Sequence, residues 1–161
     1  MSVTTEPSAE KKEALRSRLH AHCLLCGGEH AQGFRLAFEA HADGHVEASF
    51  PCDPHYQGYT GYLHGGVIAS LLDSAMTNCL FTHGHVAMTG ELKVRFLKPV
   101  IVNRPVVVSA RLDAPHAPLF KVSGEVRQHG EVMARATAKF VEVRLSNAGL
   151  LDARHAAGAS V

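Results

Sequence analysis

The chain has 161 residues, 46% of them hydrophobic, which suffices for one domain with a real core and argues against several domains. The formal net charge is +1, and acidic and basic residues are mixed along the chain without a basic stripe, which argues against a nucleic-acid partner. No stretch approaches the ~20 apolar residues of a membrane span and no signal-peptide core follows the N-terminus, so we expect a cytoplasmic protein without membrane insertion.

The N-terminal residues 1–21 are expected to form an arm that carries one short helix. Ser8 is a suitable N-cap for this helix, and Glu10 places an acid in its first turn. Residues 22–145 follow as the single domain. The Ala- and Gly-rich residues 146–161 are expected to form a flexible tail.

Cys23 and Cys26 lie two residues apart, with His20, His22 and His30 close by, a pattern that invites a zinc site. A structural zinc site needs four ligands, commonly from two separated pairs, and the sequence has no second Cys-x-x-Cys. We therefore expect ordinary packing thiols or a loosely ordered loop, and no metal. Stoichiometric zinc in the purified protein would overturn this expectation.

Residues 33–50 contain two extended runs, and the Asp43-Gly44 pair between them is a strong hairpin signal. Pro51 and Pro54 end that hairpin, and a loop rich in Gly and Tyr follows.

Residues 64–82 are the best helix candidate, because apolar residues recur on one broad face at helical spacing. The other face carries Ser70, Asp73, Ser74 and Thr77. A helix that is apolar on nearly all sides is expected to be wrapped by other structure. Asp73 is the only Asp, Glu, Lys or Arg between residues 54 and 90, and this isolation suggests a role beyond solvation.

The rest of the chain has the alternating pattern of strands, with a His-Gly turn signal at residues 129–130. The expected strands lie within residues 88–97, 104–112, 120–128 and 131–145. Consecutive strands with short turns favour an antiparallel sheet, and one helix against its face makes the fold α+β.

"HGGVIASLLDSAM" at residues 64–76, followed by "TGELKVRFLKPV" at 89–100, resembles the hot-dog-fold acyl-CoA thioesterases of the PaaI-like (phenylacetyl-CoA thioesterase-like) group. The similarity extends over about residues 22–144 and includes "CLLCGGEHAQGFRL", which is similar to the Cys-x-x-Cys-Gly opening of one branch. The resemblance implies an antiparallel sheet wrapped around one long central helix. It also implies homodimers with continuous sheets and interface active sites, often paired as homotetramers.

The resemblance also implies roles for four residues. Asp73 matches the helix carboxylate that activates water or attacks the thioester, and Gly65 matches the backbone N–H that polarises the thioester carbonyl. His64 matches the histidine before that glycine, and Thr89 matches a Ser/Thr that helps hold the nucleophilic water.

The chain departs from the family pattern in the loop before this helix. Many relatives have an asparagine six residues before His64, where this chain has Gly58; Gln57 or His55 are the candidates to replace that contact with substrate.

The chemistry explains why such residues are needed. Thioester hydrolysis requires a nucleophile and stabilisation of the negative charge that develops on the carbonyl oxygen. The first turn of a helix offers free N–H groups, and Gly65 and Gly66 allow an acyl group to approach the backbone closely. A carboxylate in apolar surroundings, such as Asp73, is poorly solvated and therefore a better base near neutral pH.

The spacing of these residues predicts a dimer. Gly65 and Asp73 are eight residues apart, which is ~12 Å along one helix and too far for both to act on one carbonyl. A two-fold axis between antiparallel central helices brings Asp73 of one subunit beside Gly65 of the other. Thr77, one turn after Asp73, is then placed to bond the attacking water with or instead of Thr89.

Each of these residues has a structural alternative. Asp73 would also be explained as a buried acid bonded to Ser70 or Thr77, His64 as a loop residue bonded to a main-chain carbonyl, and Thr89 as an ordinary strand threonine. The strand lysines and arginines are typical of an exposed sheet face, although some would also suit coenzyme A phosphates.

The expected function is hydrolysis of an acyl-CoA to a carboxylic acid and CoA, without a metal or redox cofactor. The alternative from another class is a non-catalytic acyl-CoA-binding or regulatory hot-dog protein, since fold does not determine function. A pure binder has no need of an isolated acid at Asp73, which favours the enzyme. A hot-dog dehydratase pairs a histidine and an acid at a spacing that the helix lacks.

Overall fold

The computed structural model describes residues 6–145, so the predicted tail and residues 1–5 lie outside the described part of the chain. Within these residues, six strands form one antiparallel sheet in the order β1-β2-β4-β5-β6-β3, accompanied by two α-helices and a 3₁₀ turn. The helical elements are α1 (Ala9–Leu19), η1 (Pro54–Tyr56) and α2 (Gly65–Thr82). The strands are β1 (Glu39–Ala40), β2 (Val46–Phe50), β3 (Ala87–Phe96), β4 (Val106–His116), β5 (Leu119–Gln128) and β6 (Glu131–Glu142).

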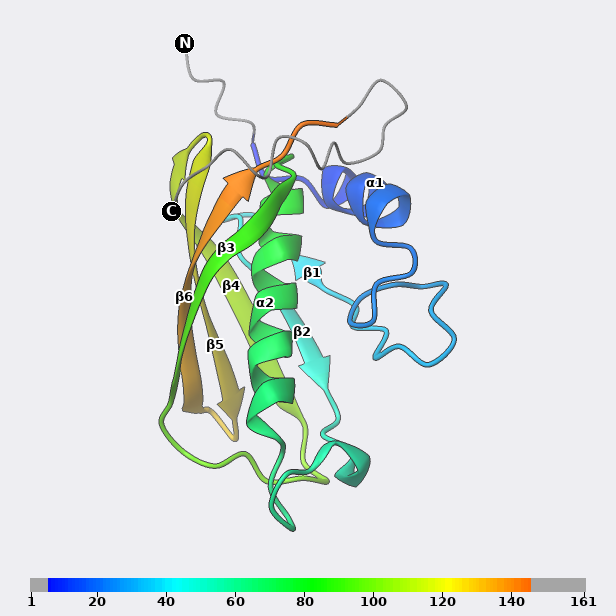
Figure 1. The fold of residues 1–161 in the computed structure, drawn as a ribbon, viewed down its shortest axis with the longest axis vertical. Coiled ribbons are helices and arrows are strands. Elements are labelled where there is room, and N and C mark those ends of the chain that lie inside the picture. The colour runs from blue at the N-terminus through cyan, green and yellow to red at the C-terminus, as the bar shows by residue number, and fades with distance from the viewer. Residues whose placement is uncertain (1–5, 146–161) are drawn as a thin grey trace.

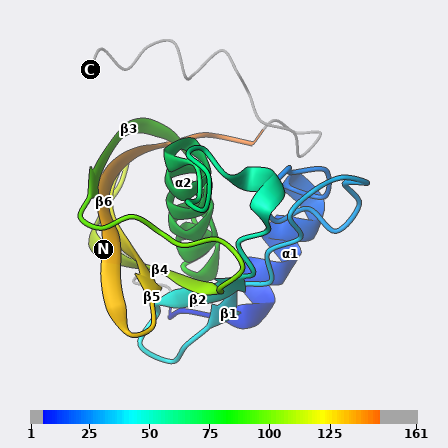
Figure 2. The same ribbon diagram turned by 90° about the horizontal axis from the view of Figure 1, so that it is seen from below.

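Helix α2 is the centre of the fold. In Figure 2, which looks along α2, the sheet curves around one side of the helix and α1 lies on the other. Leu71, Leu72 and Met76 of α2 are fully buried in the core with Val106 and Val108 of β4. Burying each such side chain contributes about 1.5–3 kcal/mol, which explains why this apolar helix is stable only when wrapped. The predicted α+β hot-dog fold is confirmed.

The predicted N-terminal helix is also confirmed, and it packs against α2 (Figure 1). Ser8 caps it by accepting a hydrogen bond from the Lys11 N–H, and the Ser8 N–H donates to the Thr82 carbonyl at 2.9 Å. Lys12 is buried, and its Nζ donates to the Phe38 carbonyl. The arm therefore covers the side of α2 that faces away from the sheet.

The first predicted strand is much shorter than expected. Only Glu39 and Ala40 pair with β2, because the preceding backbone bonds elsewhere. The N–H groups of Phe34 and Leu36 donate to the carbonyls of residues 24 and 25, at 2.8 Å each. These residues therefore hold the loop after α1 against the core.

The turn at His129-Gly130 is confirmed, with positive φ at both residues, as a two-residue hairpin turn requires. The strand order leaves β3 at one end of the sheet, bonded to β6 on one side and to no strand of the described chain on the other. Within residues 6–145, no helix combines the length and apolarity that a membrane crossing needs.

Candidate active site

Asp73 lies on α2 and faces the start of β3. Thr89 Oγ1 donates a hydrogen bond of 2.6 Å to Asp73 Oδ1, whereas Asp73 Oδ2 has no donor among the described residues. The β3–β6 register shifts between Thr89 and Glu91, and such a bulge re-aims neighbouring side chains. The structure therefore brings together two predicted site residues and leaves one carboxylate oxygen free.

Asp73 is half-buried at the wall of a cavity of about 300 Å³. The cavity lies between α2, the segment after α1 and strand β3. Its lining residues are His20, Cys23, Leu25, Ala69, Ser70, Asp73, Ser74, Thr77 and Leu92. A small apolar group of a ligand that entered this cavity would reach the carboxylate, which is therefore not sealed in the core.

Two hydroxyl groups near Asp73 on α2, those of Ser70 and Thr77, are used by the helix itself. Ser70 Oγ donates to the Gly66 carbonyl at 2.8 Å, and Thr77 Oγ1 donates to the Asp73 carbonyl at 3.0 Å. Neither hydroxyl bonds the Asp73 carboxylate, so the explanation of Asp73 as an acid satisfied by these two residues does not describe this structure. Thr77 retains lone pairs that can accept a hydrogen bond from water.

His64 caps the N-terminus of α2 and accepts hydrogen bonds from most of the N–H groups in its first turn. His64 Nδ1 accepts from the Gly66 N–H at 2.9 Å, and its carbonyl accepts from Val67 at 3.0 Å and Ile68 at 3.2 Å. The Gly65 N–H has no acceptor among the described residues. Of the predicted donors, Gly65 is therefore available to a ligand, and Gly66 is engaged by the cap.

The loop before His64 is held by Gln57. Gln57 Oε1 accepts from the Gly61 N–H at 3.0 Å, while the side chain of His55 pairs with Asp53 at 2.6 Å. A Cβ at Gly58 would lie 3.3 Å from the His64 ring, so the loop packs directly on the cap. Gln57 retains its amide N–H groups for a ligand, whereas His55 is turned to Asp53.

Gly65 and Asp73 do not meet within one chain. Both belong to the continuous helix α2, so the ~12 Å between them is set by helix geometry. Phe96 at the end of β3 lies beside Gly65, 3.5 Å from where a Cβ would stand, and is 55% exposed.

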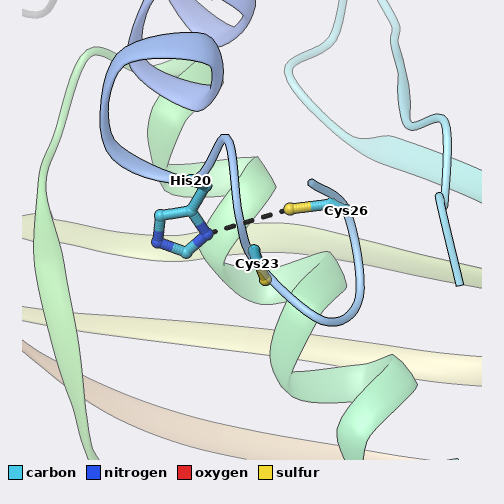
Figure 3. A group of neighbouring side chains, drawn as sticks. All are labelled: His20, Cys23 and Cys26. Carbon is cyan, nitrogen blue, oxygen red and sulfur yellow. Dashed lines mark hydrogen bonds between the residues drawn. The ribbon is translucent and has the colours of Figure 1, made fainter. Parts of the chain in front are cut away.

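The N-terminal segment forms a wall of the cavity, which the sequence analysis does not predict. His20 and Cys23 line it, and Cys26 lies behind them with its Sγ 3.8 Å from His20 Nδ1 (Figure 3). The hydrogen bond from the Cys26 thiol lowers the pKa of Cys23, and the same bond together with burial raises the pKa of Cys26. The Cys-x-x-Cys-Gly spacing is the feature of the sequence that could have predicted this cluster.

The strand cations gather away from Asp73. Lys93, Arg95, Arg111 and Arg135 line a separate hollow of about 900 Å³ formed by β3 to β6. Arg135 pairs with Glu125 at 3.7 Å, so part of this charge is neutralised on the sheet. The role of these residues as phosphate ligands stays a prediction.

A curled antiparallel sheet around one long helix defines the hot-dog class of proteins. The sequence pattern of the thioesterase superfamily matches residues 60–137, which contain both Gly65 and Asp73. This match confirms the resemblance seen in the sequence.

Named relatives agree with this assignment. The chain is 30% identical to acyl-coenzyme A thioesterase THEM4 of Bos taurus over 141 residues, covering 86% of this chain and 57% of that protein. It is also 30% identical to THEM4 of Rattus norvegicus over 118 residues, covering 71% and 51%. The chain thus spans about half the length of these relatives.

Solved structures share the fold. A thioesterase superfamily protein matches with a TM-score of 0.68 at 28% identity, over 71% of this chain and 60% of that one. The Escherichia coli PaaI protein of the phenylacetic acid degradation operon matches with a TM-score of 0.70 at 13% identity, over 84% and 92%. A Streptococcus mutans protein bound to acetyl CoA matches with a TM-score of 0.63 at 20% identity, over 66% and 87%.

Proposed function

We propose that this protein hydrolyses acyl-CoA thioesters to a carboxylic acid and CoA. The observation that carries the proposal is Asp73, held by Thr89 through one oxygen and free at the other, in the wall of a cavity. The match to the thioesterase superfamily supports it, as do relatives named acyl-coenzyme A thioesterase and a neighbour of the same fold bound to acetyl CoA.

Asp73 acts on water in the proposed reaction. Its free Oδ2 takes a proton from a water molecule whose oxygen attacks the thioester carbonyl, with Thr89 holding the carboxylate in place. The tetrahedral intermediate collapses with cleavage of the C–S bond, and the proton returns from Asp73 to the CoA sulfur. Direct attack by Oδ2, followed by hydrolysis of the mixed anhydride, uses the same geometry, and trapping by hydroxylamine at Asp73 would identify that route. The step needs water and no cofactor.

Gly65 of a second copy supplies the carbonyl donor. Its N–H is the one first-turn donor of α2 that His64 leaves without an acceptor in the described chain, and it carries the positive end of the helix dipole. Gly66 and Gln57 flank this donor and would contact the CoA ester, and His64 shapes the turn.

An obligate homodimer follows from this division of the site. The ten-residue edge strand β3 offers unpaired backbone groups, and the exposed Phe96 lies at its end beside Gly65. Antiparallel pairing of two such edges would extend the sheet across the dimer and build two equivalent sites. Dimers of dimers and a cytoplasmic location remain predictions.

A panel of aryl, short-chain and medium-chain acyl-CoAs, with thiol release measured by a colour reagent, tests the function. Asp73→Asn should retain substrate binding and lose about a hundredfold or more in kcat. Asp113→Asn is the matched control, because Asp113 is an exposed acid on β4 bonded to Ser123. Binding of CoA esters without thiol release from any of them would favour the non-catalytic alternative.

A further inference from the structure

The three side chains in Figure 3 are arranged like metal ligands. One ring nitrogen of His20 and the sulfurs of Cys23 and Cys26 all lie within 4.8 Å of one another, and Cys26 Sγ is 3.8 Å from His20 Nδ1. Around a tetrahedral Zn²⁺, with bonds of about 2.0–2.3 Å, neighbouring N and S ligands are about 3.6 Å apart. The observed spacing therefore requires little movement to bind the ion.

Backbone hydrogen bonds already hold the loop that carries the two cysteines in one conformation. The Cys23 N–H donates to the His20 carbonyl at 3.0 Å, and the Gly27 N–H donates to the Cys23 carbonyl at 2.9 Å. Gly27 must lack a side chain, because a Cβ there would lie 2.5 Å from the Ala21 carbonyl oxygen. Arg16 donates to the Cys26 carbonyl at 2.9 Å and ties the loop to α1. Little conformational entropy remains to be lost when a ligand binds.

The surroundings of the sulfurs supply hydrogen-bond donors. The backbone N–H groups of Leu25 and Cys26 are directed at the sulfur of Cys23. Ser74 of α2 faces Cys26, is only 6% exposed, and its Oγ has no hydrogen-bond partner within the described residues. Donors of this kind around a metal-bound thiolate hold it in place and tune the metal.

We propose that His20, Cys23 and Cys26 bind one Zn²⁺ ion, with the fourth coordination position open toward the cavity that contains Asp73. Two thiolates and one imidazole suit zinc better than the hard cations Mg²⁺ and Ca²⁺. His20 and Cys23 line the cavity, so water or a small anion reaches the open position from there. The expectation of no metal rested on a closed four-ligand site, and a three-ligand site with an open position does not need a second cysteine pair.

The ion has no part in the thioester step proposed above. It would fix the segment after α1 against α2 and so keep one wall of the acyl cavity in place. Because no ligand is shared with the thioester site, zinc binding should be unchanged in Asp73→Asn, and either proposal can fail without the other.

Zinc content and cobalt spectroscopy of the reduced, full-length protein test the site. We expect stoichiometric zinc on purification and, when Co²⁺ replaces it, the thiolate-to-cobalt charge-transfer band together with intense tetrahedral d–d bands. Cys23→Ser, Cys26→Ser and His20→Ala should each lose zinc. Cys52→Ala is the matched control, since Cys52 is a buried free thiol outside the cluster.

Two further measurements do not depend on the folding of a ligand variant. In the wild type, Zn²⁺ should slow the reaction of Cys23 with a thiol reagent. Ser74→Ala, which keeps all three ligands, should bind zinc about tenfold more weakly. The proposal is overturned if the reduced wild type gives no charge-transfer band with Co²⁺ and no zinc-dependent protection, or if Cys23→Ser and Cys26→Ser keep the band.

Discussion

The two sides of helix α2 differ in what they bury. On the sheet-facing side, Leu71, Leu72 and Met76 have no exposed surface and fill the core completely. On the other side, Asp73 and Thr77 are half-buried beside a cavity that the N-terminal segment closes. One side of the helix thus packs in the core, and the other side carries the residues of the candidate site.

Two hydroxyl groups on the polar side form hydrogen bonds within the helix, which favours their partial burial. Ser70 and Thr77 both bond carbonyls one turn earlier, whereas the Asp73 carboxylate bonds a partner outside the helix. That partner is Thr89 on β3, which accounts for one carboxylate oxygen. Substitutions on the two sides should therefore separate stability from activity.

The largest effect is expected on the sheet-facing side. Leu72→Ala should reduce the free energy of unfolding by about 2–5 kcal/mol, because it leaves a cavity in a fully buried position. Urea unfolding measures this loss, and kcat per folded molecule should remain near the wild-type value. The matched change Ser70→Ala should alter stability far less. Equal losses from both variants would contradict the division between the two sides.

The next effect tests whether the site is shared between two copies. Gly65→Pro removes the one N–H proposed to polarise the carbonyl, and proline is tolerated at the first position of a helix. We expect it to lower kcat about a hundredfold, as for loss of an oxyanion donor, with little loss of stability.

Co-expression of Gly65→Pro with Asp73→Asn then sharpens the test. Each mixed dimer has one site with both wild-type residues, so random pairing should restore about a quarter of the wild-type activity. A preparation of mixed dimers that stays as inactive as either variant alone would show that the two residues do not act in one site across an interface.

A smaller effect is expected when Asp73 loses its partner. Thr89→Val should lower kcat about tenfold, because a hydrogen bond to a charged group is worth about 1.5–3 kcal/mol. Thr89→Ser should recover most of the rate, since it keeps the hydroxyl. Thr77→Val, which loses only a bond to a main-chain carbonyl, should cost less. The comparison fails if Thr77→Val is the more damaging variant.

The smallest effect concerns pH and the C-terminal end of α2. Burial lowers the pKa of both His83 and His85 from the usual value, with the bond from His83 to the Gly44 carbonyl opposing this in part. The unfolded chain therefore binds more protons than the folded chain, so stability is highest above about pH 6.5 and falls as the pH drops below it. Urea midpoints between pH 5 and 8 measure the slope. His83→Gln should flatten it, and an unchanged slope in that variant would assign the effect to other groups.

Much of the fold was predictable because its signals are local. The helix expected over residues 64–82 is found at Gly65–Thr82 with His64 as its cap, since apolar spacing and capping act within a few residues. The strands after α2 were predicted by their alternation for the same reason. The first strand was overestimated, because residues 34 and 36 bond the loop after α1, and no local pattern reports such a partner.

By itself, the sequence determined the central helix, the antiparallel strands, the isolated acid at Asp73 and the diglycine at the helix start. Only the tertiary structure decided what lies on the second side of α2: the segment with His20, Cys23 and Cys26, which closes the cavity around Asp73 and gathers its own side chains into a cluster. The physical reason is the distance along the chain over which each interaction acts. Periodicity and caps depend on neighbours along the chain, whereas the covering of an apolar helix depends on which distant segment packs there best.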